Sequence, residues 1–123
     1  MAQCVLRQKS GGELILLKSG TLNDMIHTDI TLNKDFDGLL LCSSFRQGSG
    51  GLYCYAKQVS GTFDMFQRID TRNGVYSTAR GGCSVYKIKC KAGSVVQIYS
   101  TNNKDQIEPN QETTCFYYLF TQK

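Results

Sequence analysis

The residues that could perform catalysis are few and widely spaced in this chain of 123 residues. Nucleophilic catalysis of the triad kind needs a base beside the nucleophile, and the only imidazole belongs to His27. His27 stands near Asp29 on the polar face of an alternating run, which indicates a surface histidine in a strand. Asp35 and Asp37 could act as paired carboxylates on a glycoside, but they flank Phe36 in a polar segment typical of a turn. We therefore expect no enzymatic activity and no catalytic residue.

Six cysteines are the remaining reactive side chains, and they allow three interpretations. An even count in a short chain suits a disulfide framework. Metal binding is disfavoured because the sequence has no Cys-x-x-Cys pair and a single histidine. Each cysteine lies in an apolar, strand-like run, and free cysteine packs as a small buried hydrophobe, so we favour free thiols and expect no metal or cofactor. The six are Cys4, Cys42, Cys54, Cys83, Cys90 and Cys115.

One strand-like segment places aromatic and basic side chains on the same face. Alternate residues of a strand share a face, so Tyr53, Tyr55 and Lys57 point to one side, and Arg68 lies nearby in the sequence. Two tyrosines and a cation could stack on a sugar or a base. The same residues could instead pack in the core with Lys57 at its rim, which we favour. The three remain candidate ligand-binding residues.

The elements that must position these residues are short β-strands. Apolar and polar residues alternate in runs separated by Gly, Asn, Asp and Ser, and no window of helical length has apolar residues spaced three and four apart. The pattern predicts a single all-β domain over residues 1–123, an antiparallel two-sheet β-sandwich of the jelly-roll kind. About ten short strands are expected. They are Cys4–Gln8, Glu13–Lys18, Met25–Leu32, Gly38–Ser44, Leu52–Val59, Thr62–Ile69, Gly74–Thr78, Cys83–Lys89, Ser94–Tyr99 and Thr114–Thr121.

Three polar segments between the strands are candidate binding loops. Gln47–Gly51 is rich in glycine, and Thr71–Gly74 contains the Asn-Gly pair that favours a tight hairpin turn. Ser100–Gln111 is the longest polar stretch of the chain. Long exposed loops on a rigid sandwich commonly carry binding residues, so we expect these three segments to contact a ligand. The candidate residues in them are Arg72, Asn73, Asn102 and Asn103.

The last strand-like run, Cys115–Phe120, is apolar or aromatic on both faces. One face of such a strand packs on the core, and the other needs a second cover. In a domain with two sheets, that cover is a partner subunit or a loop of the same chain, and we favour the partner subunit. The predicted oligomer interface is Phe116, Tyr117, Tyr118, Leu119 and Phe120.

Charge and hydropathy exclude several partners. The formal net charge is +4 with scattered basic residues, so no nucleic-acid surface is expected. Only Lys87, Lys89 and Lys91 form a row on one strand face, which is typical of a solvated face. The first seven residues contain no apolar h-region, and the apolar runs are too short to cross a bilayer. We expect synthesis in the cytoplasm without a signal peptide, and no membrane insertion.

Two segments of the chain resemble small heads of phage tail fibres and related prophage proteins. Residues 25–41 contain a strand, a Lys34-Asp35-Phe36-Asp37 turn and an apolar strand, and residues 85–98 contain a hairpin with basic residues and Gly93. The aromatic run Cys115–Phe120 is similar to the closing strand of such heads. Those heads resemble the jelly rolls of tumour necrosis factor and complement-type proteins, which trimerise through aromatic strands. The resemblance implies a homotrimeric, virion-associated head whose partners are host-surface glycans or proteins.

The leading hypothesis is therefore a non-enzymatic receptor-binding or adhesive head of a phage-like particle. Two alternatives use the same fold. One is a small lectin, monomeric or dimeric, that uses Tyr53 and Tyr55 as a carbohydrate-binding platform. The other is a structural capsid or virion decoration protein that binds only its own particle.

Overall fold

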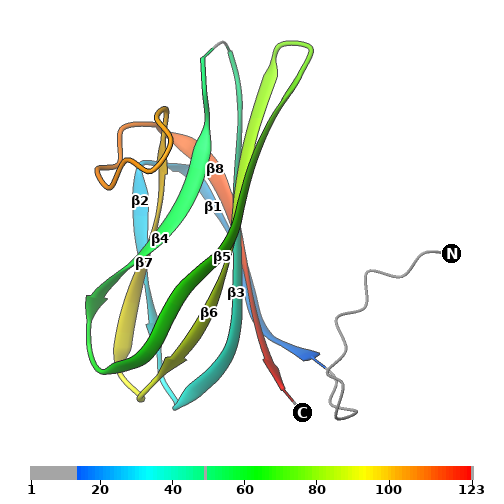
Figure 1. Ribbon diagram of the computed structural model, residues 1–123. Helices are drawn as coiled ribbons and strands as arrows, with labels where there is room; N and C mark the ends of the chain where they lie inside the picture. The colour runs from blue at the N-terminus through cyan, green and yellow to red at the C-terminus, as the bar shows by residue number, and fades with distance from the viewer. Residues whose placement is uncertain (1–13, 49, 123) are drawn as a thin grey trace, which may run out of the picture.

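The computed structural model describes residues 14–48 and 50–122, which form eight β-strands (Figure 1). No helix in this part of the chain is long and apolar enough to cross a membrane. The strands are β1 (Leu14–Met25), β2 (His27–Leu32), β3 (Phe36–Gln47), β4 (Tyr53–Ser60), β5 (Phe63–Tyr76), β6 (Ala79–Cys90), β7 (Ser94–Thr101) and β8 (Thr113–Gln122).

The strands form two antiparallel sheets packed face to face (Figure 1). The larger sheet has the order β1-β8-β3-β6-β5, and the smaller has the order β2-β7-β4. The pairing is nested along the chain: β1 pairs with β8, β2 with β7, and β3 with β6. Winding one long antiparallel hairpin around itself produces this nesting, which is the jelly-roll arrangement. The predicted all-β, two-sheet sandwich is confirmed.

The hydrophobic core fills the space between the two sheets. Period-two alternation sends every second side chain of each strand inward, as in β6, where Tyr86, Ile88 and Cys90 are buried and Lys89 is exposed. The most buried core side chains belong to strands of both sheets. They include Leu40, Cys42, Cys54, Ile88, Val96, Ile98 and Leu119.

The described residues form eight strands, not ten, because two predicted strands are one strand, β5, and a third, Cys4–Gln8, lies outside the described residues. The predicted turn Thr71–Gly74 lies inside β5, where Asn73 and Gly74 pair with Gly82 and Gly81 in a continuous ladder. The turn occurs later, at Ser77, whose φ of 55° is in the left-handed region. β5 is one of the two edge strands of its sheet, and edge strands commonly carry polar and charged residues. Its sequence therefore resembles that of a loop.

Two further differences concern the amino-terminal part. β1 extends to Met25 with two register shifts, whereas the prediction ended it at Lys18 and gave Met25 to the next strand. A bulge keeps a strand paired across residues that break the alternation, and this explains the extra length. The predicted strand Cys4–Gln8 lies outside the described residues.

Side chains of β6 connect the two sheets along one side of the sandwich. β4 is an edge strand of the smaller sheet, so one edge of its backbone lacks a neighbouring strand. The Ala56 amide on this edge donates a hydrogen bond to the Tyr86 hydroxyl at 2.9 Å, and the Cys54 carbonyl accepts one from Ser84 Oγ at 2.6 Å. These bonds satisfy buried backbone groups that would otherwise be left without partners.

The close approach of β4 to β6 depends on Gly82. A Cβ atom at this position would lie 2.7 Å from the Leu52 carbonyl oxygen and 2.7 Å from Tyr53 Cα, both of which are backbone atoms that cannot rotate away. Gly82→Ala is therefore expected to lower the free energy of unfolding by about 1–3 kcal/mol, measured by urea denaturation. Gly81→Ala is the matched control, because its Cβ would meet only the Ser44 carbonyl oxygen at 3.6 Å. Equal stability of the two variants would contradict this account.

Candidate functional site

Of the three residues considered for catalysis, His27 lies on the surface, and Asp35 and Asp37 contact neighbouring segments of the chain. His27 is exposed at the start of β2. Asp35 Oδ1 accepts a hydrogen bond from the Ala92 amide at 2.9 Å, which ties the β2–β3 turn to the β6–β7 turn. Asp37 Oδ1 lies 3.1 Å from Lys87 Nζ on the neighbouring strand. Within the described residues, no group of three or more His, Cys, Asp or Glu side chains could hold a metal ion.

The five described cysteines are free thiols, and Cys4 lies outside the described residues. Four of the five are buried, while Cys83 is partly exposed on β6. A hydrogen bond with the Cys54 thiol, together with burial, raises the pKa of Cys115, and burial raises the pKa of Cys90. Buried thiols with raised pKa values are poor nucleophiles, so these cysteines act as packing residues.

The three strand residues predicted to share a face do so, on the outer side of the smaller sheet. Cys54 and Ala56 alternate with them and face the core. The ring of Tyr53 lies nearly parallel to that of Tyr55, with centroids 6.1 Å apart. Tyr55 is only 2% exposed, because other parts of the chain cover it. Tyr55 is therefore buried, as the favoured interpretation predicted, but its cover lies on the outer side of the smaller sheet and not in the cluster between the sheets, and Tyr55 is no open platform for a sugar.

The cover over Tyr55 comes from the β7–β8 loop, residues 102–112, and from β5. The Asp105 amide donates a hydrogen bond to the Tyr55 hydroxyl at 2.8 Å, and the Tyr99 hydroxyl donates one to the Gln106 carbonyl at 3.1 Å. Arg68 Cζ lies 5.1 Å from the centroid of the Tyr55 ring, and Arg68 Nη2 lies 2.7 Å from Asp105 Oδ1. Two buried phenols and one ion pair thus hold the loop against the sheet.

A pocket of about 450 Å³ opens between β4, β5 and this loop, and we call it the β4–β5 pocket. One charged residue of the pocket is Lys57. Its Nζ lies 5.4 Å from the centroid of the Tyr99 ring and 3.4 Å from the Ile107 carbonyl oxygen. No described carboxylate forms an ion pair with Lys57. The lining residues are Tyr55, Ala56, Lys57, Phe66, Arg68, Tyr86, Tyr99, Asp105 and Ile107.

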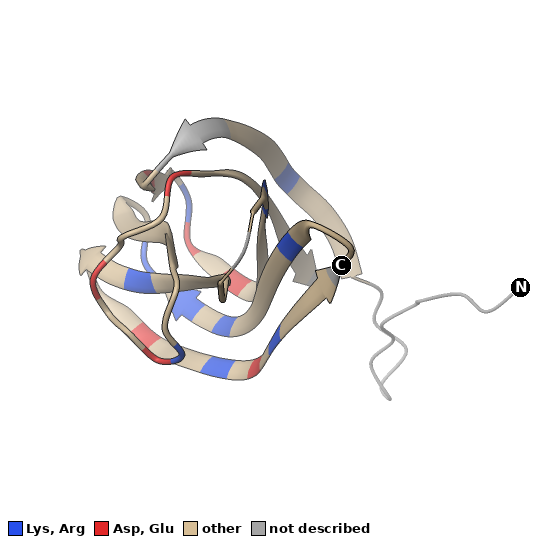
Figure 2. Cartoon of the chain, turned by 90° about the horizontal axis from the view of Figure 1, so that it is seen from above, with Lys and Arg blue, Asp and Glu red and all other residues tan. Residues whose placement is uncertain are grey.

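The pocket's positive charge is local and does not extend over the domain. Lys and Arg residues of the described chain are spread around the sandwich with Asp and Glu among them (Figure 2). Two cations, Lys57 and Arg68, share the pocket with one carboxylate, that of Asp105, which leaves one positive charge in excess. An uncharged ligand would make no use of this charge.

The predicted loop residues Asn102 and Asn103 are exposed in the β7–β8 loop, where they take part in hydrogen bonds within the loop. Asn102 Oδ1 accepts a hydrogen bond from Asn110 Nδ2 at 2.7 Å, and Asn103 Nδ2 donates one to Gln106 Oε1 at 2.6 Å. Neither lines the β4–β5 pocket. Both side chains therefore shape the loop rather than the pocket beneath it.

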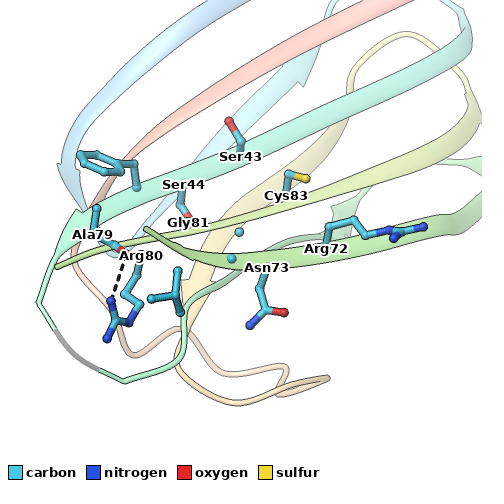
Figure 3. Close-up of a pocket in the computed structure, with 12 residues that line it drawn as sticks. Ser43, Ser44, Arg72, Asn73, Ala79, Arg80, Gly81 and Cys83 are labelled. Atoms are coloured by element: carbon cyan, nitrogen blue, oxygen red, sulfur yellow. Dashed lines mark hydrogen bonds between the residues drawn. The ribbon is translucent and has the colours of Figure 1, made fainter. Parts of the chain in front are cut away.

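Arg72 and Asn73, also predicted to lie in a loop, belong to β5 and line a second hollow of about 560 Å³ near the β5–β6 turn (Figure 3). Ser43 and Cys83 project from one side of the strands there, and Asn73 and Arg80 project from the other (Figure 3). Arg72 Nε lies 2.9 Å from Asp70 Oδ2, so its charge is paired. This hollow and the β4–β5 pocket share no lining residue, so the predicted ligand-binding residues do not form one site.

The outer side of the larger sheet carries an apolar surface, which we call the apolar outer face. Its centre is on β8 and β3, where Tyr118 pairs with Leu41 and Phe120 with Leu39. The rings of Tyr118 and Phe120 stack with centroids 6.5 Å apart. No described loop crosses this face (Figure 1). It comprises the half-buried Leu39, Leu41, Val85, Phe116, Tyr118 and Phe120 and the exposed Phe45.

Of the five predicted interface residues, only three point outward. Tyr117 and Leu119 face the core and are 6% and 0% exposed, so they cannot contact a partner. Phe116, Tyr118 and Phe120 are half-buried on the apolar outer face.

Sequence reasoning missed most of the β4–β5 pocket. Tyr99 carried a usable signal, because it is an aromatic residue alternating with the buried Val96 and Ile98 and hence on the outer face of its strand. Arg68 was noted only as a basic residue near Lys57 in the sequence, and Asp105 carried no signal. Their ion pair joins residues 37 positions apart, and only the folded chain brings them together.

The cysteines should differ sharply in reactivity. Cys83 is partly exposed, so iodoacetamide at neutral pH should modify it in the folded protein. Cys42, Cys54, Cys90 and Cys115 are buried and should react only after unfolding in urea. Peptide mass spectrometry of samples alkylated with and without urea measures both states. Rapid native labelling of Cys54 or Cys115 would contradict the described packing.

Stability should fall at alkaline pH because of buried phenols. Burial raises the pKa of Tyr86 well above its ordinary value of 10.0 and that of Tyr99 to about 12. Above pH 10.0 the unfolded chain loses these protons and the folded protein keeps them, so their contribution is complete below that pH and declines as pH rises. Urea unfolding on both sides of pH 10.0 measures the decline.

Tyr86→Phe is the matched variant for this effect. It leaves the Ala56 amide without its acceptor, so its free energy of unfolding should be about 1–3 kcal/mol lower at neutral pH. It also lacks one buried phenol, so its stability should decline less steeply above pH 10.0. Parallel declines in the two proteins would show that Tyr86 does not titrate as described.

Comparison with known proteins places the chain in no family: no protein-family model, curated protein or solved structure matches it.

Proposed function

We propose that this protein is a non-enzymatic binding head that assembles as a homotrimer and presents loops to a host-surface receptor. The apolar outer face carries the proposal. It gathers three aromatic side chains of β8 and aliphatic side chains of β3 on one surface that no described loop covers. Contiguous apolar surface of this kind marks a site of protein–protein contact.

A second copy of the chain is the partner that suits this face best. Homo-oligomer interfaces are more apolar than transient ones and are enriched in aromatic residues. A closed ring requires two different surfaces on each copy, because each contact joins unlike patches. The β1 edge supplies a second apolar patch, with Ile15, Leu16 and Leu17 exposed by 41%, 50% and 56%.

The loops at one end of the sandwich form the receptor-facing surface in this proposal. The β3–β4 loop meets the β5–β6 turn through a hydrogen bond from the Gly48 amide to the Thr78 carbonyl at 2.8 Å. Arg80 Nε donates to the Gly50 carbonyl at 3.0 Å, which holds the same two segments together. The β7–β8 loop extends from the same end (Figure 1). Assignment to a phage-like particle is supported by the resemblance of residues 25–41 and 85–98.

A lectin is the second candidate function, and the β4–β5 pocket favours it. A lectin of this fold would bind carbohydrate as a monomer or dimer, without need of a trimer. A decoration protein would bind its own particle through the same apolar outer face and would need no pocket. Oligomeric state in solution therefore separates the leading proposal from both.

The protein is expected to be a trimer at micromolar concentration, with three times the 13.7 kDa mass of the chain. Leu41→Lys places a charge at the centre of the apolar outer face, where burial against a partner would be costly. This variant should be a folded monomer. Size-exclusion chromatography with light scattering gives the mass, and circular dichroism verifies the β-structure.

Val95→Lys is the matched control, because Val95 is a half-buried residue on the outer side of the smaller sheet, where no contact between copies is proposed. It should remain a trimer. A monomeric wild-type protein would overturn the proposal, and so would loss of the trimer in Val95→Lys with its retention in Leu41→Lys.

A further inference from the structure

We infer that the β4–β5 pocket binds a sugar that carries a carboxylate group, with Lys57 and Arg68 facing the carboxylate. The inference deepens the proposed function and rests on it, because it names the chemical class of receptor that the binding head recognises. It begins with the excess positive charge of a pocket that holds two cations and one carboxylate.

Both cations retain hydrogen-bond donors for a ligand. Lys57 Nζ has three donors, and its described contacts are the Ile107 carbonyl oxygen at 3.4 Å and the face of the Tyr99 ring. The guanidinium of Arg68 has five N–H groups, and only Nη2 contacts Asp105 Oδ1. A ligand carboxylate accepts charge-assisted hydrogen bonds from both side chains.

The other lining groups suit the hydroxyls and the C–H face of a sugar. Asp105 is exposed and keeps one carboxylate oxygen free to accept hydrogen bonds from hydroxyl groups. Phe66 and Ile107 add apolar surface on which a sugar ring can lie. A bare anion would use only the cations, and a fatty acid would place an alkyl chain against Asp105 at a desolvation cost. The volume of about 450 Å³ suits a small ligand of this class.

The pocket is held in shape without a ligand. The Tyr55 and Tyr99 hydroxyls bond to the backbone of the β7–β8 loop, so little loop ordering is needed on binding. It also remains open in the proposed trimer, because none of its lining residues belongs to the apolar outer face or to the β1 edge. Three copies of a weak site would then act together on a multivalent surface.

Three probes separate the parts of the inference in NMR titrations of the full chain. Galacturonic acid has the sugar ring and the carboxylate, galactose has the ring alone, and acetate has the carboxylate alone. Galacturonic acid should give saturable shifts of the backbone amide signals of Lys57, Arg68, Asp105 and Ile107. Galactose and acetate should bind about tenfold more weakly or worse, because each lacks one set of contacts.

Matched charge variants locate the binding. Lys57→Gln removes one cation and leaves the ion pair of Arg68 with Asp105 intact, and it should weaken galacturonic acid binding about tenfold. Arg68→Gln should weaken it at least as much, although it also removes a contact of the loop. Lys104→Gln makes the same charge change in the β7–β8 loop, next to Asp105, but Lys104 does not line the pocket, so the affinity of this variant should equal that of the wild-type protein.

Each outcome bears on a different part of the inference. Equal binding of galactose would overturn the role of the carboxylate, equal binding of acetate would overturn the role of the sugar ring, and no saturable shift would overturn both. Light scattering on the same samples reports the trimer separately. A trimer with an unresponsive pocket refutes only this inference, whereas a monomer with a saturable pocket refutes only the proposed assembly.

Discussion

The hydrogen bond from the Ala56 amide to the Tyr86 hydroxyl, with its neighbour between Ser84 and Cys54, fixes the distance between the two sheets on one side of the sandwich. β4 has no strand beyond it there, so side chains of β6 satisfy its backbone instead. Because β6 is held close to β4, the next strand, β5, extends past the smaller sheet and brings Arg68 over the Tyr55 ring. The β4–β5 pocket exists because of this closure.

The larger sheet has two different faces, and the same alternation of residues produces both. On β8, Tyr117 and Leu119 fill the core while Tyr118 and Phe120 form part of the apolar outer face. The run Cys115–Phe120 of β8 is apolar on both faces, which differs from the alternation of apolar and polar residues in a strand with one solvated face. The smaller sheet also carries aromatic residues on its outer side, Tyr55 and Tyr99, and the β7–β8 loop of the same chain covers them.

The fold class followed from period-two patterning, which depends only on neighbouring residues. Local pattern also identified the solvated face of β6, but it did not show which face of β8 is buried, since Tyr117 and Leu119 were predicted to lie at an interface and are core residues. It failed at β5, where Asn73 and Gly74 are turn formers held in a ladder by pairing with Gly82 and Gly81. It predicted the burial of Tyr55 but not its cover, which is a loop fifty residues later in the chain. The charge of the pocket could not be predicted from local pattern either, because Arg68 and Asp105 are brought together only by tertiary structure.

The nested pairing of strands has a consequence for how the chain reaches its native state. Among the described strands, β3 lies between β6 and β8, and β1 pairs only with β8, so both need a strand that follows much later in the sequence. Contacts between residues so distant in sequence form slowly, because a long loop must close first. Until β8 is available to pair with it, β3 presents an unpaired apolar edge that includes Leu39 and Leu41, and in that interval the folding chain is most prone to aggregation.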